Sequence, residues 1–188
     1  MAKEKIRILV VDDNAAIHAS IKSILQEKSL AQQRKDSPFN MLFSSENNRN
    51  PDNKLDKGEG QEATENLWFE EIDFDIVTSL QGENGFTTYV DAKEKNKSFD
   101  LIVCDMRMPP GWDGMKTMAE ISKIDPGALI IMCSAYSDYT FEQVMNNVGT
   151  LLKVTFFDKP IDPQEFTRLI HKKVEWILAL RKDDKIQV

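Results

Sequence analysis

The amino-acid sequence predicts an α/β protein with a doubly wound parallel sheet of five strands. Short apolar runs recur along the chain without regular polar alternation, the pattern of strands buried on both faces of a sheet. Segments with apolar residues at helical spacing separate these runs. Because crossover helices between parallel strands are almost always right-handed, this alternation leaves few topologies.

Five runs are predicted to be strands. Residues 73–79 (DFDIVTS) alternate between polar and apolar side chains, and therefore suit an edge of the sheet. The other four are almost entirely apolar and suit positions buried on both faces: 6–11 (IRILVV), 100–105 (DLIVCD), 128–134 (ALIIMCS) and 154–158 (VTFFD).

Helices are predicted at 15–27, 83–95, 113–124, 139–148 and 163–182. The last of them begins at Pro163, a residue type that is favoured in the first helical turn. Its apolar residues mostly form one inward stripe, but Trp176 and Leu180 lie off that stripe. Two explanations stay open for this pair: a slightly apolar solvent face, or a continuation of the helix that signals onward or contacts a second copy.

A long insertion separates the first helix from the second strand, where about two to six residues would be usual. It covers 30–71 within a single domain predicted at 1–182, and residues 183–188 form a C-terminal tail. The middle of the insertion, 44–66, carries six acidic and three basic residues and almost no apolar ones. Such a segment cannot bury enough surface to offset its ordering entropy, so we expect a mobile loop. A tolerated surface insertion is favoured over a dedicated partner site.

Composition and charge exclude several classes of protein. The chain has 188 residues, 41% of them hydrophobic and 29% charged, with a formal net charge of −7. No basic stripe balances this acidity, which argues against nucleic-acid binding by this chain. No apolar run has the length of a signal core or a membrane span. Cys104 and Cys133 lie in predicted interior strands, so buried free thiols and a cytoplasmic location are expected.

Charged and polar residues follow the predicted strands at the point where each strand ends. The first strand ends in Asp12 and Asp13, the third in Asp105, the fourth in Ser134, and the fifth is followed by Lys159. Ligands of open parallel sheets bind outside the carboxyl ends of the strands. Three carboxylates at one rim would repel each other, and oxygen-only ligands favour Mg²⁺, with Mn²⁺ as the alternative.

Each of these residues also has a simpler explanation. Asp13 or Asn14 could cap the following helix, and the Lys159–Pro160 pair could form a turn. We interpret His18 and His171 as structural rather than metal-binding. The joint order of these residues along four successive strands is what favours a functional site.

The motifs at these strand ends resemble the receiver domain of two-component response regulators. They read ILVVDDN (8–14), LIVCDMRMPPGWDG (101–114), IIMCSAYSD (130–138) and FFDKPID (156–162). The resemblance covers 5–27 and 72–181. The motif DMRMPPGWDG is similar to that of a subgroup of receiver domains in which an insertion precedes the second strand.

This resemblance implies a flavodoxin-like receiver fold with strand order 2-1-3-4-5. It also implies a role for each site residue. Asp105 matches the phospho-accepting aspartate; Asp12 and Asp13, together with Asp105 and the Arg107 carbonyl, match the Mg²⁺ ligands; Lys159 matches the lysine that pairs with the phosphoryl group; Ser134 and Phe156 match the switch pair; and Pro160 is expected to follow a cis peptide. The departures are the insertion and the bulky Arg107 and Tyr136, which would flank access to the phosphoryl group.

The implied activity is transfer of a phosphoryl group from a phosphohistidine to Asp105. The expected phosphoryl donor is a histidine kinase or a histidine phosphotransfer protein. A downstream effector, or a second copy of this chain in a self-dimer, is the expected partner for the output of the signal. The chain would catalyse only its own phosphorylation and dephosphorylation, and would change the face formed by the fourth and fifth helices. Two alternatives stay open: a receiver-like interaction module that signals without phosphate, and an aspartyl-phosphate phosphohydrolase, which would need a second acid where Arg107 stands.

Overall fold

A computed structural model describes residues 3–35, 72–135 and 153–184 of the chain. Its five strands are β1 (Glu4–Val11), β2 (Ile72–Ser79), β3 (Leu101–Asp105), β4 (Leu129–Ser134) and β5 (Lys153–Asp158). All neighbouring strands pair in parallel, in the order β2-β1-β3-β4-β5. The predicted fold class and strand order are therefore confirmed, and β2 lies at an edge as its alternating pattern indicates.

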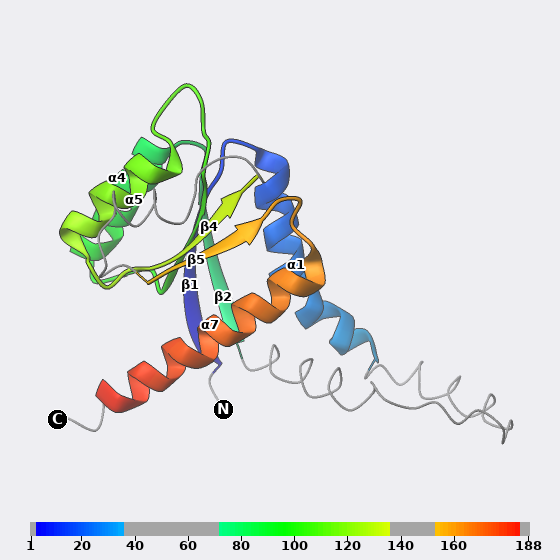
Figure 1. The fold of residues 1–188 in the computed structure, drawn as a ribbon. Coiled ribbons are helices and arrows are strands. Elements are labelled where there is room, and N and C mark those ends of the chain that lie inside the picture. Colours follow the sequence, from blue (N-terminus) through cyan, green and yellow to red (C-terminus); the bar gives the residue numbers. More distant parts are fainter. Residues whose placement is uncertain (1–2, 36–71, 136–152, 185–188) are drawn as a thin grey trace, which may run out of the picture.

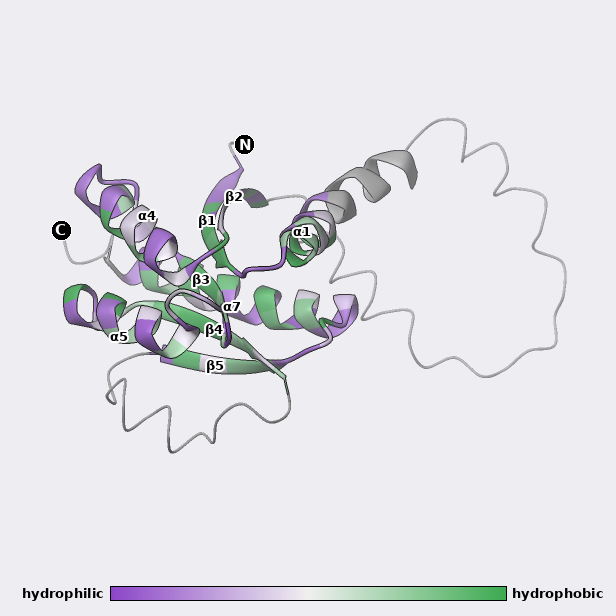
Figure 2. Ribbon diagram, turned by 90° about the horizontal axis from the view of Figure 1, so that it is seen from above, coloured by the Kyte–Doolittle hydropathy of each residue, from purple (hydrophilic) through white to green (hydrophobic). Residues whose placement is uncertain are grey.

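Helices cover both faces of the sheet (Figure 1). On one face, α4 (Gly82–Glu94) and α5 (Gly114–Ile124) pack over a core that includes Leu9, Ile102 and Met132. On the other face, α1 (Ala15–Lys35) and α7 (Pro163–Asp184) pack over a second core. Residues that alternate along each strand divide between the two cores, and Figure 2 shows the hydrophobic colour concentrated in the sheet.

Polar side chains define where the helices begin. The Asn14 side chain accepts a hydrogen bond from the Ala16 amide at 2.9 Å, so Asn14 rather than Asp13 caps α1. Asp113 accepts from the Lys116 amide at 2.7 Å before α5. Asp162 accepts from the amides of Gln164 and Glu165 before α7. Pro163 then occupies the first position of that helix, as predicted.

The predicted end of one helix and the predicted environment of one strand are wrong. Helix α1 continues to Lys35, beyond its predicted end at residue 27 and into the range assigned to the insertion. Strand β5 is not buried on both faces: it pairs only with β4, and all six of its residues are partly or fully exposed. An edge strand has a neighbouring strand on one side only, so its other side stays accessible to water even when its sequence is apolar. The predicted helix 139–148 and the predicted mobile part 44–66 lie outside the described residues.

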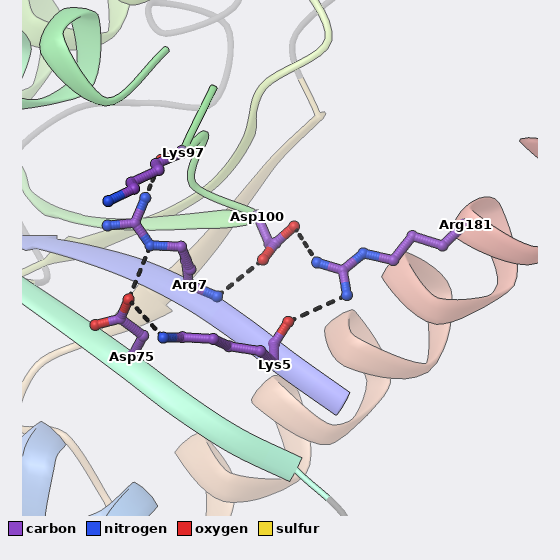
Figure 3. Close-up of polar contacts among 6 residues, drawn as sticks. All are labelled: Lys5, Arg7, Asp75, Lys97, Asp100 and Arg181. Atoms are coloured by element: carbon purple, nitrogen blue, oxygen red, sulfur yellow. Dashed lines mark hydrogen bonds and ion pairs between the residues drawn. The ribbon is translucent and has the colours of Figure 1, made fainter. Parts of the chain in front are cut away.

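A polar cluster joins the last turn of α7 to the amino-terminal half of the sheet (Figure 3). Asp100, just before β3, accepts hydrogen bonds from the Arg7 amide at 2.8 Å and from the Arg181 guanidinium at 2.6 Å. Arg181 also donates to the Lys5 carbonyl at 3.1 Å, and Arg7 pairs with Asp75 of β2 at 2.9 Å. These bonds fix α7 at the end of the sheet opposite to the predicted site.

Both cysteines are buried and free, as predicted. Within the described residues, no helix is both long enough and apolar enough to cross a membrane.

Candidate functional site

The strand order places the predicted site residues on one rim of the sheet. Strands β1, β3, β4 and β5 are successive neighbours. Asp12 and Asp13 directly follow β1, Asp105 and Ser134 are the last residues of β3 and β4, and Lys159 directly follows β5. Because all strands run in the same direction, these residues meet at the carboxyl edge.

Three carboxylates gather at this rim. Oxygen atoms of Asp12, Asp13 and Asp105 lie within 4.8 Å of one another. Asp12 and Asp105 are buried, with 2% and 7% of their surface exposed, whereas Asp13 is exposed. Since Asn14 caps α1, the Asp13 carboxylate is not needed at the helix terminus.

Lys159 bridges two of these acids. Its Nζ lies 2.8 Å from Asp12 Oδ2 and 2.8 Å from Asp105 Oδ1. The Lys159 amide donates to the Ser134 carbonyl at 2.8 Å, which ties the end of β5 to the end of β4. The peptide bond between Lys159 and Pro160 is cis.

Burial and charge act against each other in this group. Burial raises the pKa of Asp105, the bond from Lys159 opposes this rise, and the net pKa lies above the usual value. Burial acts to lower the pKa of Lys159, but its hydrogen bonds to Asp105 and Asp12 outweigh burial, so its pKa is raised. One ammonium against three carboxylates leaves the rim with a formal excess of two negative charges.

The donor set fits a hard divalent cation. The acidic cluster offers only oxygen atoms, which suits Mg²⁺ or Mn²⁺ better than zinc. Both oxygens of Asp12 already accept hydrogen bonds, Oδ1 from the Asn14 amide at 2.9 Å and Oδ2 from Lys159. Asp13 is therefore better suited than Asp12 to bind an ion directly.

The loop after Asp105 is closely packed. The Met106 amide donates to the Cys133 carbonyl at 2.9 Å, and the Gly114 amide donates to the Met106 carbonyl at 3.0 Å. A Cβ on Gly114 would stand 2.2 Å from the Asp105 carbonyl oxygen, so only glycine fits there. The Arg107 backbone hydrogen-bonds to the Asp105 carboxylate and lowers its pKa, while the Arg107 side chain is exposed.

The remaining predicted residues lie around this group or outside the described part. Ser134 is partly buried at the end of β4. Phe156 stands opposite Met132 in the sheet and packs, partly buried, against the core under α4 and α5. Tyr136 lies outside the described residues. His18 is buried, with 8% of its surface exposed.

Sequence patterns do not reveal two further residues at this rim, Ser79 and Gln81. The Asp12 amide donates to the Ser79 carbonyl at 3.1 Å, and the Gln81 side-chain amide donates to the Pro109 carbonyl at 3.5 Å. Both residues are uncharged; Ser79 ends the edge strand β2, and Gln81 lies in the turn after it. The only local signal is the glycine that follows Gln81.

Comparisons with known proteins agree with this geometry. A family model described as the response regulator receiver domain matches residues 61–171, more than half of the chain. Strand β1 with its two acids precedes the matched segment, and the structure inserts β1 between β2 and β3.

Curated relatives are longer proteins. The transcriptional regulatory protein ZraR of Salmonella typhimurium is 33% identical over 78 residues, 42% of this chain and 16% of ZraR. The transcriptional regulatory protein GlrR of Escherichia coli is 26% identical over 102 residues, 54% of this chain and 21% of GlrR. The matched part thus spans only about a sixth to a fifth of the length of these relatives.

Solved structures share the fold at low sequence identity. A response regulator receiver domain protein from Clostridium thermocellum aligns with a TM-score of 0.57 and 19% identity, over 93% of this chain and 98% of that one. The CheX–CheY–BeF3–Mg²⁺ complex from Borrelia burgdorferi aligns with a TM-score of 0.51 and 19% identity, over 92% and 89%. With the family match over more than half of its length and the strand order and rim described above, this chain belongs to the response regulator receiver domain family.

Proposed function

We propose that this chain accepts a phosphoryl group on Asp105 from the phosphohistidine of a histidine kinase or a histidine phosphotransfer protein. The observation that carries the proposal is the position of Lys159, which bridges Asp105 and Asp12 at 2.8 Å beside a third carboxylate. A nucleophilic carboxylate, the ammonium group of a lysine and a set of oxygen ligands for a metal are the groups that phosphoryl transfer needs.

In the proposed reaction an Asp105 carboxylate oxygen attacks phosphorus, an O–P bond forms, and the N–P bond to the donor histidine breaks. Mg²⁺, held by Asp13, Asp105 and the Arg107 carbonyl with Asp12 nearby, would neutralise charge on the transferring group. Lys159 exchanges its ion pair with Asp105 for a phosphoryl oxygen, so its charge remains compensated. The chain acts only on itself in this scheme and does not turn over a substrate.

The switch that follows would use Ser134 and Phe156. The Ser134 hydroxyl donates to a second phosphoryl oxygen and draws its loop inward, and Phe156 moves into the space left behind. The partly buried position of Phe156 in the edge strand β5 supports this role. The altered face would comprise the fourth helix, predicted at 139–148, and the fifth, α7.

The lifetime of the acyl phosphate would depend on Arg107 and Tyr136. Arg107 is two residues past Asp105, and its exposed side chain would lie across the phosphoryl oxygens. Neither residue is a general base at neutral pH, so we expect slow self-dephosphorylation. Decay of the phosphoprotein should be faster in the double variant Arg107→Ala/Tyr136→Ala than in the wild type; equal decay rates would contradict this.

Partners and context follow from the same proposal. The relatives named above are transcriptional regulators, so a downstream effector or a second copy is the expected recipient of the signal. We assign the motif DMRMPPGWDG and the insertion after α1, within one domain at 1–182, to the receiver subgroup that shares them. The phosphohydrolase alternative is disfavoured because Arg107 occupies the position of its second acid.

Intact-mass measurement after treatment with acetyl phosphate and Mg²⁺ tests the proposal. A stable adduct of about 80 Da is expected for the wild type. Asp105→Asn should show none, while the exposed Asp91→Asn control should still be modified. Rapid release of phosphate would support a hydrolase, and no reaction of the wild type would leave the inert interaction module.

A further inference from the structure

Gln81 occupies the N-cap position of α4 but does not cap that helix. Its backbone is extended, with φ −143° and ψ 149°, and its side chain makes no capping hydrogen bond. Serine, threonine, aspartate and asparagine are the residues that usually serve this position. A cap residue whose side chain is directed elsewhere breaks a local rule, and such exceptions cluster where another role is served.

The Gln81 side chain lies against the loop that follows Asp105. Its Nε2 donates to the Pro109 carbonyl at the long distance of 3.5 Å. Its Oε1 is buried, and no donor in the described part of the chain reaches it. A Cβ placed on Gly111 would stand 2.4 Å from this oxygen, so the Gly111 backbone packs directly on the amide. This side chain therefore fills the space between the start of α4 and the loop.

The end of β2, just before this turn, contacts the acidic pair. The Ser79 carbonyl accepts the Asp12 amide at 3.1 Å, and the Ser79 hydroxyl donates to the Gln81 carbonyl at 3.1 Å. The next residue, Gly82, lies so close to the loop that a Cβ would stand 2.6 Å from the Trp112 carbonyl. The end of β2 and the short turn after it thus touch both parts of the rim: the backbone of Asp12, and the loop that carries the Arg107 carbonyl.

We propose that Gln81 is a positioning residue that sets the distance between the Asp12–Asp13 pair and the 107–112 loop, and thereby the affinity of the rim for Mg²⁺. This inference rests on the proposed function, because it assigns the metal to that rim. Gln81 itself contacts no metal ligand side chain in this arrangement. Its side chain contacts the backbone of Pro109 and Gly111 on one side. Its backbone carbonyl accepts from Ser79 on the other side.

A substitution of similar volume separates positioning from mere support of the fold. Gln81→Met removes one long hydrogen bond together with a buried acceptor that has no donor, so unfolding of the metal-free protein should change little. The Mg²⁺ dissociation constant, measured by calorimetric titration, should rise by about three- to ten-fold, less than the ten- to hundred-fold typical of groups bonded directly to a ligand. Without metal, the amides of Gly111 and Trp112 should exchange hydrogen faster.

A second pair of variants tests the same contact from the other side. Gly111→Ala places a methyl group against the Gln81 amide and should displace it, weakening Mg²⁺ binding in the same way. In a Gln81→Ala background the obstacle is gone, so Gly111→Ala should then have no further effect. Thr87→Ala, an exposed neutral position on the same helix, is the matched control and should bind Mg²⁺ like the wild type.

The outcomes are distinguishable. If the wild type binds Mg²⁺ and Gln81→Met binds it within two-fold as tightly, the positioning role is refuted while the proposed function stands. Loss of stability with an unchanged dissociation constant would also refute it, since that is the result of a structural role. If the wild type does not bind Mg²⁺, the proposed function and this inference both fail.

Discussion

Lys159 holds two buried carboxylates together, and its removal should destabilise the protein in a way that Mg²⁺ can reverse. We consider Lys159→Met, which keeps the apolar stem and removes the ammonium. The side chains of Asp12 and Asp105 are only 3% and 8% exposed, and each lies 2.8 Å from Nζ. Without Lys159 the two acids would face each other without a positive charge between them.

The size of the effect follows from burial. Removing one partner of a fully buried ion pair costs about 3–5 kcal/mol. The Lys159 side chain is 22% exposed, so water compensates part of the loss, and Asp105 can take up a proton because its pKa is already raised by burial. We therefore expect the free energy of unfolding at neutral pH without metal to fall by about 2–3 kcal/mol. Saturating Mg²⁺ should restore most of this, because it binds only the folded rim.

The pH dependence gives an independent check. In the variant the Lys159 bond no longer opposes burial, so the folded pKa of Asp105 rises further above its unfolded value of about 3.9. A carboxyl with a raised pKa costs nothing below its unfolded pKa, and its penalty grows as the pH rises above that value. The difference in unfolding free energy between wild type and Lys159→Met should thus be small near pH 4 and full at neutral pH.

Urea denaturation at several pH values, with and without millimolar Mg²⁺, measures all of this. Lys173→Met is the matched control: its ammonium donates to the Thr155 hydroxyl, and burial lowers its pKa, so removing its charge should cost little and Mg²⁺ should not compensate. If Lys159→Met unfolds as the wild type does, or if Mg²⁺ stabilises both proteins equally, the ion pairs are not what balances the acidic rim.

Three further predictions concern the frame around the site. Gly114→Ala forces a methyl group to 2.2 Å from the Asp105 carbonyl, so we expect a loss of about 2–4 kcal/mol in urea denaturation and weaker Mg²⁺ binding. Burial acts to raise the pKa of Asp125, but bonds from Lys93 and Tyr89 outweigh burial and lower that pKa overall. Asp125→Asn should therefore reduce the free energy of unfolding by about 1 kcal/mol at pH values above the ordinary aspartate pKa of about 3.9, and this loss should vanish as the pH falls through the lowered pKa of Asp125. Asp100→Ala removes bonds to the β1 backbone and to the last turn of α7 (Figure 3), so that turn should exchange hydrogen faster while Mg²⁺ binding stays unchanged.

Much of the fold is predictable because apolar periodicity is a local property of the chain. The five strands appear within two residues of their predicted positions, and Pro163 begins the last helix as expected. The errors have local causes too. The apolar stripe of the first helix stops near Leu25, which predicts an end at residue 27, yet α1 continues to Lys35. An apolar sequence could not tell a central strand from the edge strand β5.

The sequence by itself determined which segments become strands and that an acid, a hydroxyl or a lysine stands where each of four strands ends. Those features depend on neighbouring residues and on the period of two or 3.6 residues. Only the tertiary structure decided that Lys159 pairs with Asp12, 147 positions away, and that the Gln81 side chain leaves its own helix to pack on Gly111. Contacts of this kind depend on how strands remote in the chain are ordered in the sheet. A local sequence pattern covers only neighbouring residues and therefore cannot predict such contacts.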